Sequence, residues 1–328
     1  MSAAHSASSM TTPSRSQSSR ESCTLQRFAA MSVVTRIKNR STEPYSLFVR
    51  HLRSRMKRIP RPLGTLTFLL AWLVPWRPAF RIRAKQSKLS FFVQRRDLLG
   101  RHLAKYGTHE QPLTQWMSNY LAASSHRGIF IDVGANLGWH TVQAAQHDTV
   151  EAVIAFEPDM FNAWLLDRNL TLNGIDKAVI NVCAVGAQHG TARIHRYKRS
   201  NYGRHSLLAD YGYGSRTVPI TDLDTALDTL GLRDRRVLII KIDVEGYEPA
   251  VIAGATQTLA RTEVVIIEHS PGLSRSGGLS ADDMLDRLHA AGFTPHTLAV
   301  DGQIAAITVD DVRQVEGQID VIWIRAPT

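Results

Sequence analysis

The stretch Ile129–Gly138, which reads IFIDVGANLG, decides the fold of this chain of 328 residues. It begins as an apolar run, typical of a buried strand, that ends in the acidic Asp132. The chain then turns through Gly134 and Gly138, and a segment that we expect to be helical follows. A strand that leads through a glycine-rich turn into a helix is the first half of a βαβ nucleoside-binding unit.

The next apolar run supplies the second half of that unit. Residues 152–156 predict another strand, and Glu157 follows it directly, 23 positions after Gly134. An acidic residue at that distance is placed to accept hydrogen bonds from ribose hydroxyls. We therefore expect Asp132 and Glu157 at the carboxyl ends of neighbouring strands, where ligands of open α/β sheets bind.

The spacing of the turn restricts the nucleoside. A dinucleotide fingerprint reads G-x-G-x-x-G, and its middle glycine lets the backbone approach a pyrophosphate. Here the turn reads G-x-N-x-G, so Asn136 fills the space that a phosphate needs, and no G-x-x-x-x-G-K-[ST] loop is present. Taken alone, Gly134 and Gly138 also fit a plain tight turn. In register with Asp132 and Glu157, they favour a phosphate-free adenosine ligand, of which S-adenosyl-L-methionine is the common one.

Strand and helix patterns alternate from residue 128 onward, which predicts a doubly wound α/β sheet with helices on both faces. The predicted strands are 129–133, 152–156, 179–183, 237–242, 263–268, 295–299 and 319–324. The predicted helices are 138–147, 160–172, 222–231, 248–260 and 280–291, and residues 192–197 are expected to form an added hairpin with the third strand. The glycine- and tyrosine-rich segment 202–215 fits either a loop that closes over a ligand or a plain surface loop.

Charge is distributed unevenly along the chain. The formal net charge is +10, but residues 1–110 carry 21 Lys and Arg against 4 Asp and Glu, and the remainder carries 18 against 25. A basic leader on a mildly acidic body indicates an anionic partner surface, either membrane lipid or nucleic acid. Because neither an aromatic platform nor a known reader motif accompanies the basic residues of 36–61, we expect no nucleic-acid partner.

The most apolar stretch, Leu63–Trp76, spans 14 residues, which is shorter than the roughly 20 that cross a membrane as a helix. With its basic flanks it fits a peripheral membrane contact through residues 36–83, and it fits equally a helix packed on the domain or at a dimer contact. Residues 1–25 have the composition of a disordered segment, of an organellar transit peptide, or of a gene start upstream of an initiator at Met31.

Cysteine usage points to a reducing compartment. Cys23 and Cys183 make neither a disulfide framework nor a zinc spacing. We therefore expect a cytoplasmic protein, with contact to the inner membrane surface as one interpretation of the leader.

Several blocks of the chain together resemble the FkbM-type S-adenosylmethionine-dependent methyltransferases. The blocks are Ile131–Gly138, Ala155–Asp159, Asn181–Gly186, Val218–Asp224, Lys241–Gly246 and Glu268–His269, with Arg96–Asp97, Gly100–Arg101 and Tyr106–Glu110 ahead of them. The resemblance covers about residues 90–325 and leaves 1–85 without an explanation. Together with composition and hydropathy, it divides the chain into a basic leader that we expect to be disordered (1–62), a short apolar and basic segment (63–87) and a methyltransferase domain (88–328).

The resemblance implies a class I methyltransferase Rossmann-like sheet of seven strands, the last antiparallel, and methyl transfer to a hydroxyl oxygen on a sugar, glycan, lipid-linked or polyketide-type acceptor. It places the methionine end of the cofactor against Asp132, Gly134, Asn136 and Gly138, the ribose against Glu157, and adenine against Ala184 and Val185. It also places Asp243 near the amino group of the cofactor or the reacting centre.

Methylation of a hydroxyl releases a proton, so a base near the acceptor helps. The candidates are Asp243, Glu245 and His269, all at predicted strand ends on one rim of the sheet. Glu245 fits a helix-start carboxylate equally well, and His269 also fits a structural histidine. Lys241 is expected to pair with a neighbouring acid. No trusted ligand spacing supports a metal site. A non-catalytic nucleoside-binding protein and, less favoured because of Asn136, an NAD-dependent oxidoreductase remain as alternatives.

Overall fold

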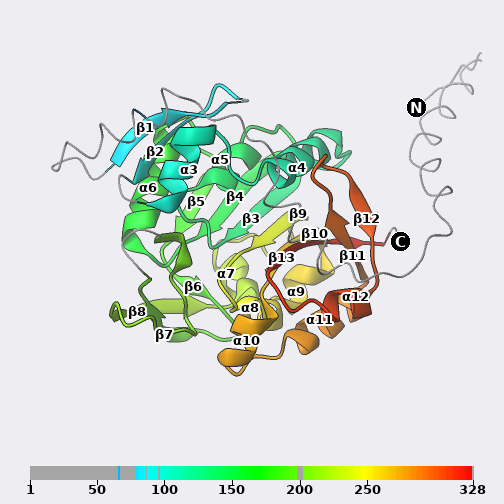
Figure 1. Ribbon diagram of the computed structural model, residues 1–328. Coiled ribbons are helices and arrows are strands. Elements are labelled where there is room, and N and C mark those ends of the chain that lie inside the picture. The colour runs from blue at the N-terminus through cyan, green and yellow to red at the C-terminus, as the bar shows by residue number, and fades with distance from the viewer. Residues whose placement is uncertain (1–65, 67–78, 86, 95–96, 198–201, 327–328) are drawn as a thin grey trace, which may run out of the picture. The chain divides into compact units, whose positions relative to one another are not determined.

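The computed structural model describes residues 66, 79–85, 87–94, 97–197 and 202–326 (Figure 1). The chain divides into one unit of Met1–Tyr45 and another of Ser46–Thr328, and every described residue lies in the second. The predicted leader 1–62 lies outside the described residues, as does the apolar stretch 63–76 apart from Leu66. Of the segment 63–87, Ala79–Arg83 forms strand β1. None of the described helices is long and apolar enough to span a membrane.

The central sheet has eight strands in the order β12-β11-β13-β10-β9-β3-β4-β5. Their bounds are β3 Gly128–Val133, β4 Val150–Phe156, β5 Ala178–Asn181, β9 Val237–Ile242, β10 Thr262–His269, β11 Phe293–Leu298, β12 Ile304–Ala306 and β13 Ile319–Arg325. The inner strands are parallel, whereas β13 runs antiparallel to both β10 and β11. The predicted sheet of seven strands with an antiparallel last strand is therefore confirmed, and β12 is an eighth strand at the edge.

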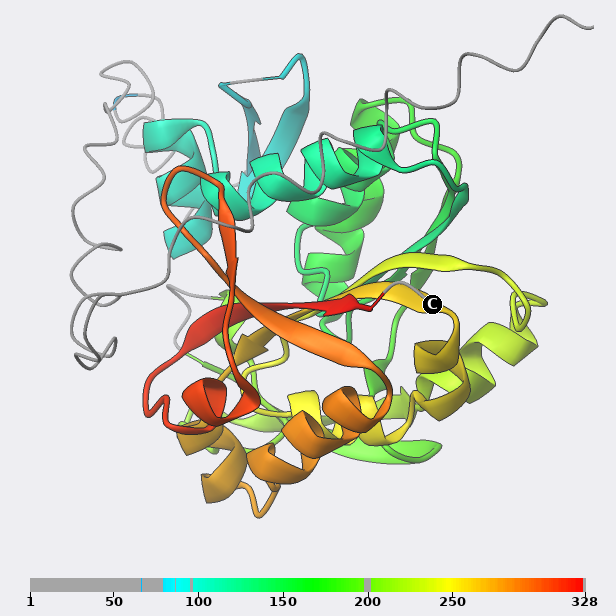
Figure 2. The same ribbon diagram turned by 90° about the vertical axis from the view of Figure 1, so that its right-hand side faces the viewer.

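Helices cover both faces of this sheet (Figure 2). One face carries α3 (Leu98–Tyr106), α4 (Gln111–Ala123), α5 (Trp139–Ala144) and α6 (Met160–Leu172). The other carries α7 (Leu223–Thr229), α8 (Glu248–Ala253), α9 (Thr256–Ala260), α11 (Ala281–Ala290) and α12 (Val309–Arg313), with α10 (Pro271–Ser276) after β10. Successive residues of β3 alternate between the two cores, as the pleat of a strand requires.

The predicted helix 248–260 is two helices, α8 and α9, separated at Gly254. A Cβ added to Gly254 would lie 2.1 Å from the backbone oxygen of Gly186, so the two backbones meet where no side chain fits. This close approach places the end of α8 against the residue that follows Ala184–Val185, a strand (β6) of a second, smaller sheet.

The second sheet has the order β6-β8-β7, with β6 Ala184–Val185, β7 Gly190–His195 and β8 Ser215–Thr221. The predicted hairpin between the third strand and residues 192–197 is wrong, because β7 pairs antiparallel with β8 instead. The sequence conceals β8, since Pro219 within it reduces the strand signal. Figure 1 shows this sheet beside the carboxyl ends of the central strands.

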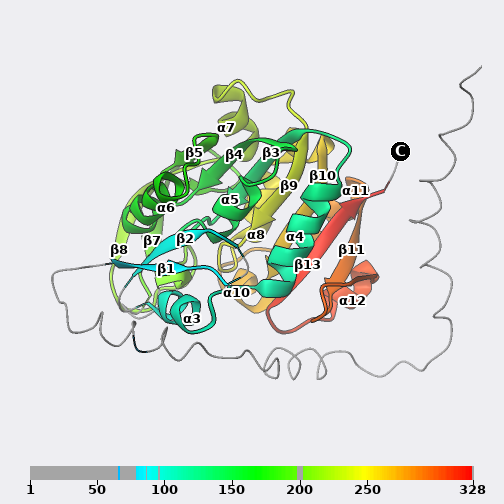
Figure 3. The same cartoon turned by 90° about the horizontal axis from the view of Figure 1, so that it is seen from above.

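At the amino-terminal side, β1 pairs with β2 (Ser90–Gln94), and β2 packs on α6 (Figure 3). Asn169 of α6 fixes this contact because its side chain accepts a hydrogen bond from Phe92 N at 2.6 Å and donates to Leu137 O at 2.7 Å. Asn169 thereby ties β2 and α6 to the glycine-rich turn after β3.

Candidate functional site

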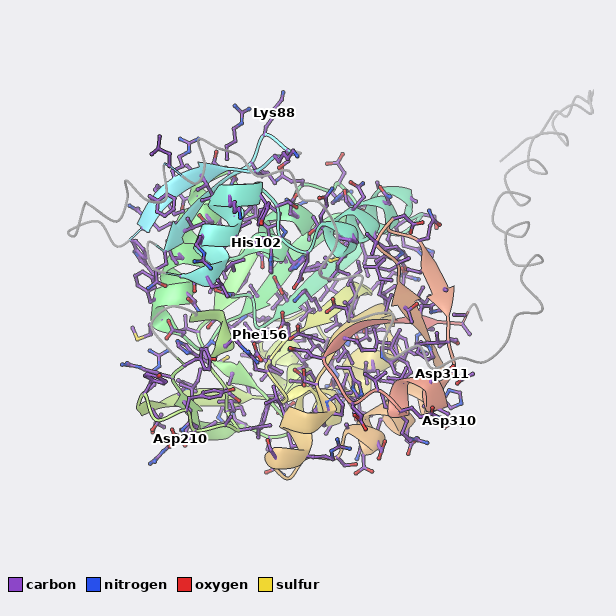
Figure 4. The ribbon with its side chains drawn as sticks, viewed as in Figure 1. Lys88, His102, Phe156, Asp210, Asp310 and Asp311 are labelled. Carbon is purple, nitrogen blue, oxygen red and sulfur yellow. The ribbon has the colours of Figure 1, made fainter. Side chains whose placement is uncertain are left out.

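A pocket opens at the carboxyl ends of β3, β4 and β9. In Figure 4 Phe156, the last residue of β4, lies near the middle of the view and marks its position. The wall contains Val133, Gly134, Asn136, Phe156, Glu157, Pro158, Asn162, Cys183, Ala184, Val185, Ile194, Gly203, His205, Leu207, Asp243, Val244 and Glu245. Seven predicted site residues are among them: Gly134, Asn136, Glu157, Ala184, Val185, Asp243 and Glu245.

The glycine-rich turn is tightly held. Gly134 has φ = 83°, and a Cβ there would lie 2.0 Å from the backbone oxygen of Asp243. Gly138 has φ = 87°, and a Cβ there would meet Leu166 Cδ1 at 2.2 Å. Asn136 adopts φ = 52°, a left-handed conformation that asparagine tolerates better than most residues. Both glycines are required for this turn, which keeps the loops after β3 and β9 in contact.

Glu157 is the buried carboxylate of the pocket, with 5% of its surface exposed. Its Oε2 accepts a hydrogen bond from Asn136 N at 2.8 Å, and its Oε1 accepts one from Asp159 N at 2.7 Å. Burial raises the pKa of Glu157 to about 7, although these backbone hydrogen bonds oppose the shift. The Asn162 side chain also hydrogen-bonds this carboxylate. Because a carboxylate has about four acceptor positions, one remains for a ligand hydroxyl.

The second sheet and the segment after it supply an apolar wall. Ala184 and Val185 of β6 are buried, and Ile194 and Leu207 lie on the same pocket. An adenine ring has the flat, largely apolar faces that such a wall accommodates. The sequence predicted Ala184 and Val185 here but gave no signal for Leu207, which comes from the ambiguous segment 202–215.

The end of β9 carries paired charges. Lys241 Nζ donates to Asp243 Oδ2 at 3.0 Å, as the expected pairing of Lys241 requires. Glu245 has φ = 52°, and its Oε1 lies 3.3 Å from Arg204 Nε. Burial and the nearby Asp243 raise the pKa of Glu245 to about 7. Glu248 holds the intervening loop, since its Oε1 accepts hydrogen bonds from the backbone nitrogens of residues 244 and 246.

Three predicted site residues do not line the pocket. Asp132 is buried behind the turn, where Thr141 Oγ1 donates to its Oδ2 at 2.6 Å. Gly138 caps α5 and serves the turn. His269 is 2% exposed, neither ring nitrogen has a hydrogen-bond partner among the described residues, and burial lowers its pKa to about 4. The described residues contain no group of three or more His, Cys, Asp or Glu that could hold a metal ion.

A second cluster of ionisable groups was not assigned a role by sequence reasoning. Glu110 Oε2 lies 2.9 Å from His140 Nε2, and Glu110 Oε1 lies 3.4 Å from His109 Nε2. Burial alone would raise the pKa of Glu110, but His109, His140 and Lys241 outweigh it and hold the pKa well below its usual value. The only sequence signal was the block Tyr106–Glu110, which lies far from the predicted strand ends.

Fold and site together define the class. The strand order, the antiparallel last strand, the left-handed turn after β3 and the buried acid after β4 make a class I methyltransferase site. A family model described as the methyltransferase FkbM domain matches residues 132–295, half of the chain. The chain therefore belongs to the FkbM methyltransferase family, and its cofactor is S-adenosyl-L-methionine.

The similar solved structures include several methyltransferases. The chain is 11% identical to precorrin-6y C5,15-methyltransferase from Geobacter metallireducens over 67% of this chain and 90% of that one, with a TM-score of 0.37. It is 11% identical to Pyrococcus abyssi tRNA (uracil-54, C5)-methyltransferase in complex with S-adenosyl-L-homocysteine over 75% and 44% of the two chains, with a TM-score of 0.36. No curated protein matches the chain. Because these similarities are small, the assignment rests on the family match and the sheet.

Proposed function

We propose that this protein transfers a methyl group from S-adenosyl-L-methionine to a hydroxyl oxygen on a sugar, glycan, lipid-linked or polyketide-type acceptor. The observation that carries the proposal is the pocket that joins the Glu157 carboxylate to the ionisable rim at Asp243 and Glu245. The part of the pocket at Glu157 suits adenosine, and the part at Asp243 and Glu245 suits an acceptor that must lose a proton.

The residues of the pocket fit the cofactor in three parts. Glu157 accepts a hydrogen bond from a ribose hydroxyl, and the wall of Ala184 and Val185 packs on adenine. The turn at Gly134 and Asn136 faces the methionine end. The bound cofactor supplies a methyl group that is already activated on a sulfonium, so the main task of the protein is to align the acceptor oxygen with it.

Transfer of radiolabel tests the proposal. Full-length protein is incubated with S-adenosyl-L-methionine labelled in its methyl group and a panel of sugars, glycans, lipid-linked sugars and polyketide alcohols, with amines and thiols as controls. We expect label in an alkali-stable ether of one hydroxyl class and at least a tenfold lower rate for Asp243→Asn. Label only in amines or thiols would contradict the proposal. Cofactor binding without transfer to any compound would favour the nucleoside-binding alternative.

We also propose that the basic segment 36–83 holds the protein at an anionic membrane surface. The support is the excess of Lys and Arg in residues 1–110, because each basic residue near an anionic surface contributes about 1 kcal/mol. Full-length protein should float with vesicles that contain phosphatidylglycerol. A full-length variant with Glu at Arg53, Arg55, Lys57, Arg58 and Arg61 should not. Equal flotation of the two proteins would contradict this contact.

A further inference from the structure

We propose that His109, backed by Glu110, is the base that takes the proton of the acceptor hydroxyl. This inference rests on the proposed transfer to oxygen and names a catalytic group for it. His109 belongs to the segment that precedes the central sheet.

The backbone around His109 is fixed. Thr114 Oγ1 donates to His109 O at 3.1 Å, and Trp139 Nε1 of α5 donates to Thr114 Oγ1 at 3.0 Å. Glu110 caps α4 with φ = 41°, and its backbone oxygen accepts a hydrogen bond from Thr114 N at 2.8 Å. A strained left-handed glutamate held on several sides is typical of a functional position.

The cluster lies beside the glycine-rich turn, because Glu110 Oε2 lies 2.9 Å from Nε2 of His140, which follows Gly138 by two residues. The charges of Glu110, Lys241 and Asp243 act on the pKa of His109 together with its neighbour His140, and Asp243 itself lines the pocket. The rings of His102 and His140 complete its surroundings, with centroids 6.1 Å and 6.3 Å from that of His109. Because ribose is assigned to Glu157 on the other side of the Gly134 turn, the methyl group is expected on the Asp243 side, and the charge of Asp243 acts on His109.

The other ionisable groups of the rim are engaged. Asp243 is paired with Lys241, and Glu245 with Arg204. Burial and the charges of Asp243 and Asp320 raise the pKa of Glu268 well above its usual value. These groups can position an acceptor, and protonation of Asp243 or Glu245 would break its ion pair.

His109 offers a basic lone pair. Burial lowers its pKa, so the ring is neutral at pH 7. Its Nε2 lies 3.4 Å from Glu110 Oε1, and Nδ1 makes no hydrogen bond to any residue that the structure describes. We assign the ring proton to Nε2 because it is the nitrogen next to the carboxylate. The side chain is 29% exposed, so part of it is accessible from solvent.

The proposed step balances. The acceptor oxygen forms a bond to the methyl carbon while the carbon–sulfur bond breaks, and the electron pair of that bond stays on the sulfur of the S-adenosylhomocysteine product. His109 Nδ1 takes the hydroxyl proton. The Glu110 carboxylate then stabilises the imidazolium, as the acid of a catalytic triad stabilises its histidine.

Nuclear magnetic resonance tests the position of His109 without knowledge of the acceptor. The pKa of the His109 ring is measured in full-length protein saturated with S-adenosyl-L-homocysteine or with S-adenosyl-L-methionine. Because the sulfonium charge disfavours a nearby imidazolium, we expect the pKa to be lower by about one unit or more with S-adenosyl-L-methionine. The exposed His289 of α11 is the control and should titrate equally in both complexes. An equal His109 pKa in the two complexes would overturn the proposal.

Two variants secure the result. His109→Gln removes the His109 resonance and thereby assigns it. If that variant does not fold, Glu110→Gln assigns the resonance instead, because the loss of the anion should lower the pKa of His109. For any hydroxyl compound that accepts label, His109→Gln should lower kcat by about 100-fold or more and leave the affinity for S-adenosyl-L-homocysteine unchanged. Undiminished transfer would overturn the role of His109. Failure of wild-type protein to bind either nucleoside would instead overturn the proposed function.

Discussion

Glu157 and Asp243 follow two strands of one sheet, but the structure holds them in different ways. Glu157 accepts two backbone hydrogen bonds, and no cation among the described residues pairs with it. Asp243 is paired with the buried Lys241. The difference teaches that the pocket has two halves. We propose that the half at Glu157 recognises neutral hydroxyls and that the charged half at Asp243 lies where the methyl group is transferred.

The largest effect is expected at the charged half. Lys241→Met leaves Asp243 without its cation and removes the positive charge near Glu110 and Asp132. Loss of one partner of a buried ion pair costs about 3–5 kcal/mol, so the free energy of unfolding should fall by that amount. Urea unfolding measures it, and Asp243→Asn added to Lys241→Met should restore part of the loss. A fall in the free energy of unfolding of less than about 1 kcal/mol for Lys241→Met would contradict the proposed difference between the two halves of the pocket.

Glu248, like Glu157, is a carboxylate held by backbone amides, and its substitution tests how the burial of such a group affects stability. It is fully buried, its Oε2 has no hydrogen-bond partner among the described residues, and burial raises its pKa to about 8. Because the folded state holds this proton more tightly than the unfolded state, wild-type stability falls as pH rises from about 4.5 to about 8. Glu248→Gln should therefore gain about 2–4 kcal/mol over wild type between pH 5 and pH 9. Urea unfolding across this range checks it, and a gap independent of pH would contradict it.

The affinity for the cofactor should depend on pH through Glu157. The pKa of Glu157 is about 7, so its ionised form is present above pH 7 and is lost as pH falls through 7. We propose that this ionised form accepts the hydrogen bond of a ribose hydroxyl. Calorimetry with S-adenosyl-L-homocysteine should show about tenfold weaker binding at pH 6 than at pH 8. The Glu157→Gln variant is the control and should show a flat profile over this range. Equal wild-type affinity at both pH values would contradict the role of this carboxylate.

The smallest effect is expected at Arg204, which pairs with Glu245 as Lys241 pairs with Asp243 but is 39% exposed. Half-exposed pairs contribute about 0–1 kcal/mol. Arg204→Met should therefore lower the free energy of unfolding by less than about 1 kcal/mol in the same urea measurement. A loss as large as that of Lys241→Met would show that burial does not separate the two pairs.

Sequence patterns predicted the central sheet well because its strands are buried on both sides and read as continuous apolar runs. They missed β12, which is short and at an edge, and they gave β7 the wrong partner, since Pro219 weakens the strand signal of β8. Within the site, they predicted residues that directly follow strands, such as Glu157 and Asp243. They missed the cluster of His109, Glu110 and His140, because only the packing of α4 on α5 brings the segment before the central sheet to His140.

Calorimetric titration of wild type, Glu157→Ala and Glu151→Ala with S-adenosyl-L-homocysteine tests the central claim most directly. Glu151 lies on the same strand and faces solvent, so its variant is the matched control. We predict one binding site in wild type and Glu151→Ala, and at least about 100-fold weaker binding in Glu157→Ala, because hydrogen bonds to a charged group contribute about 1.5–3 kcal/mol each. Undiminished affinity in Glu157→Ala, or binding of NAD alone, would contradict the account.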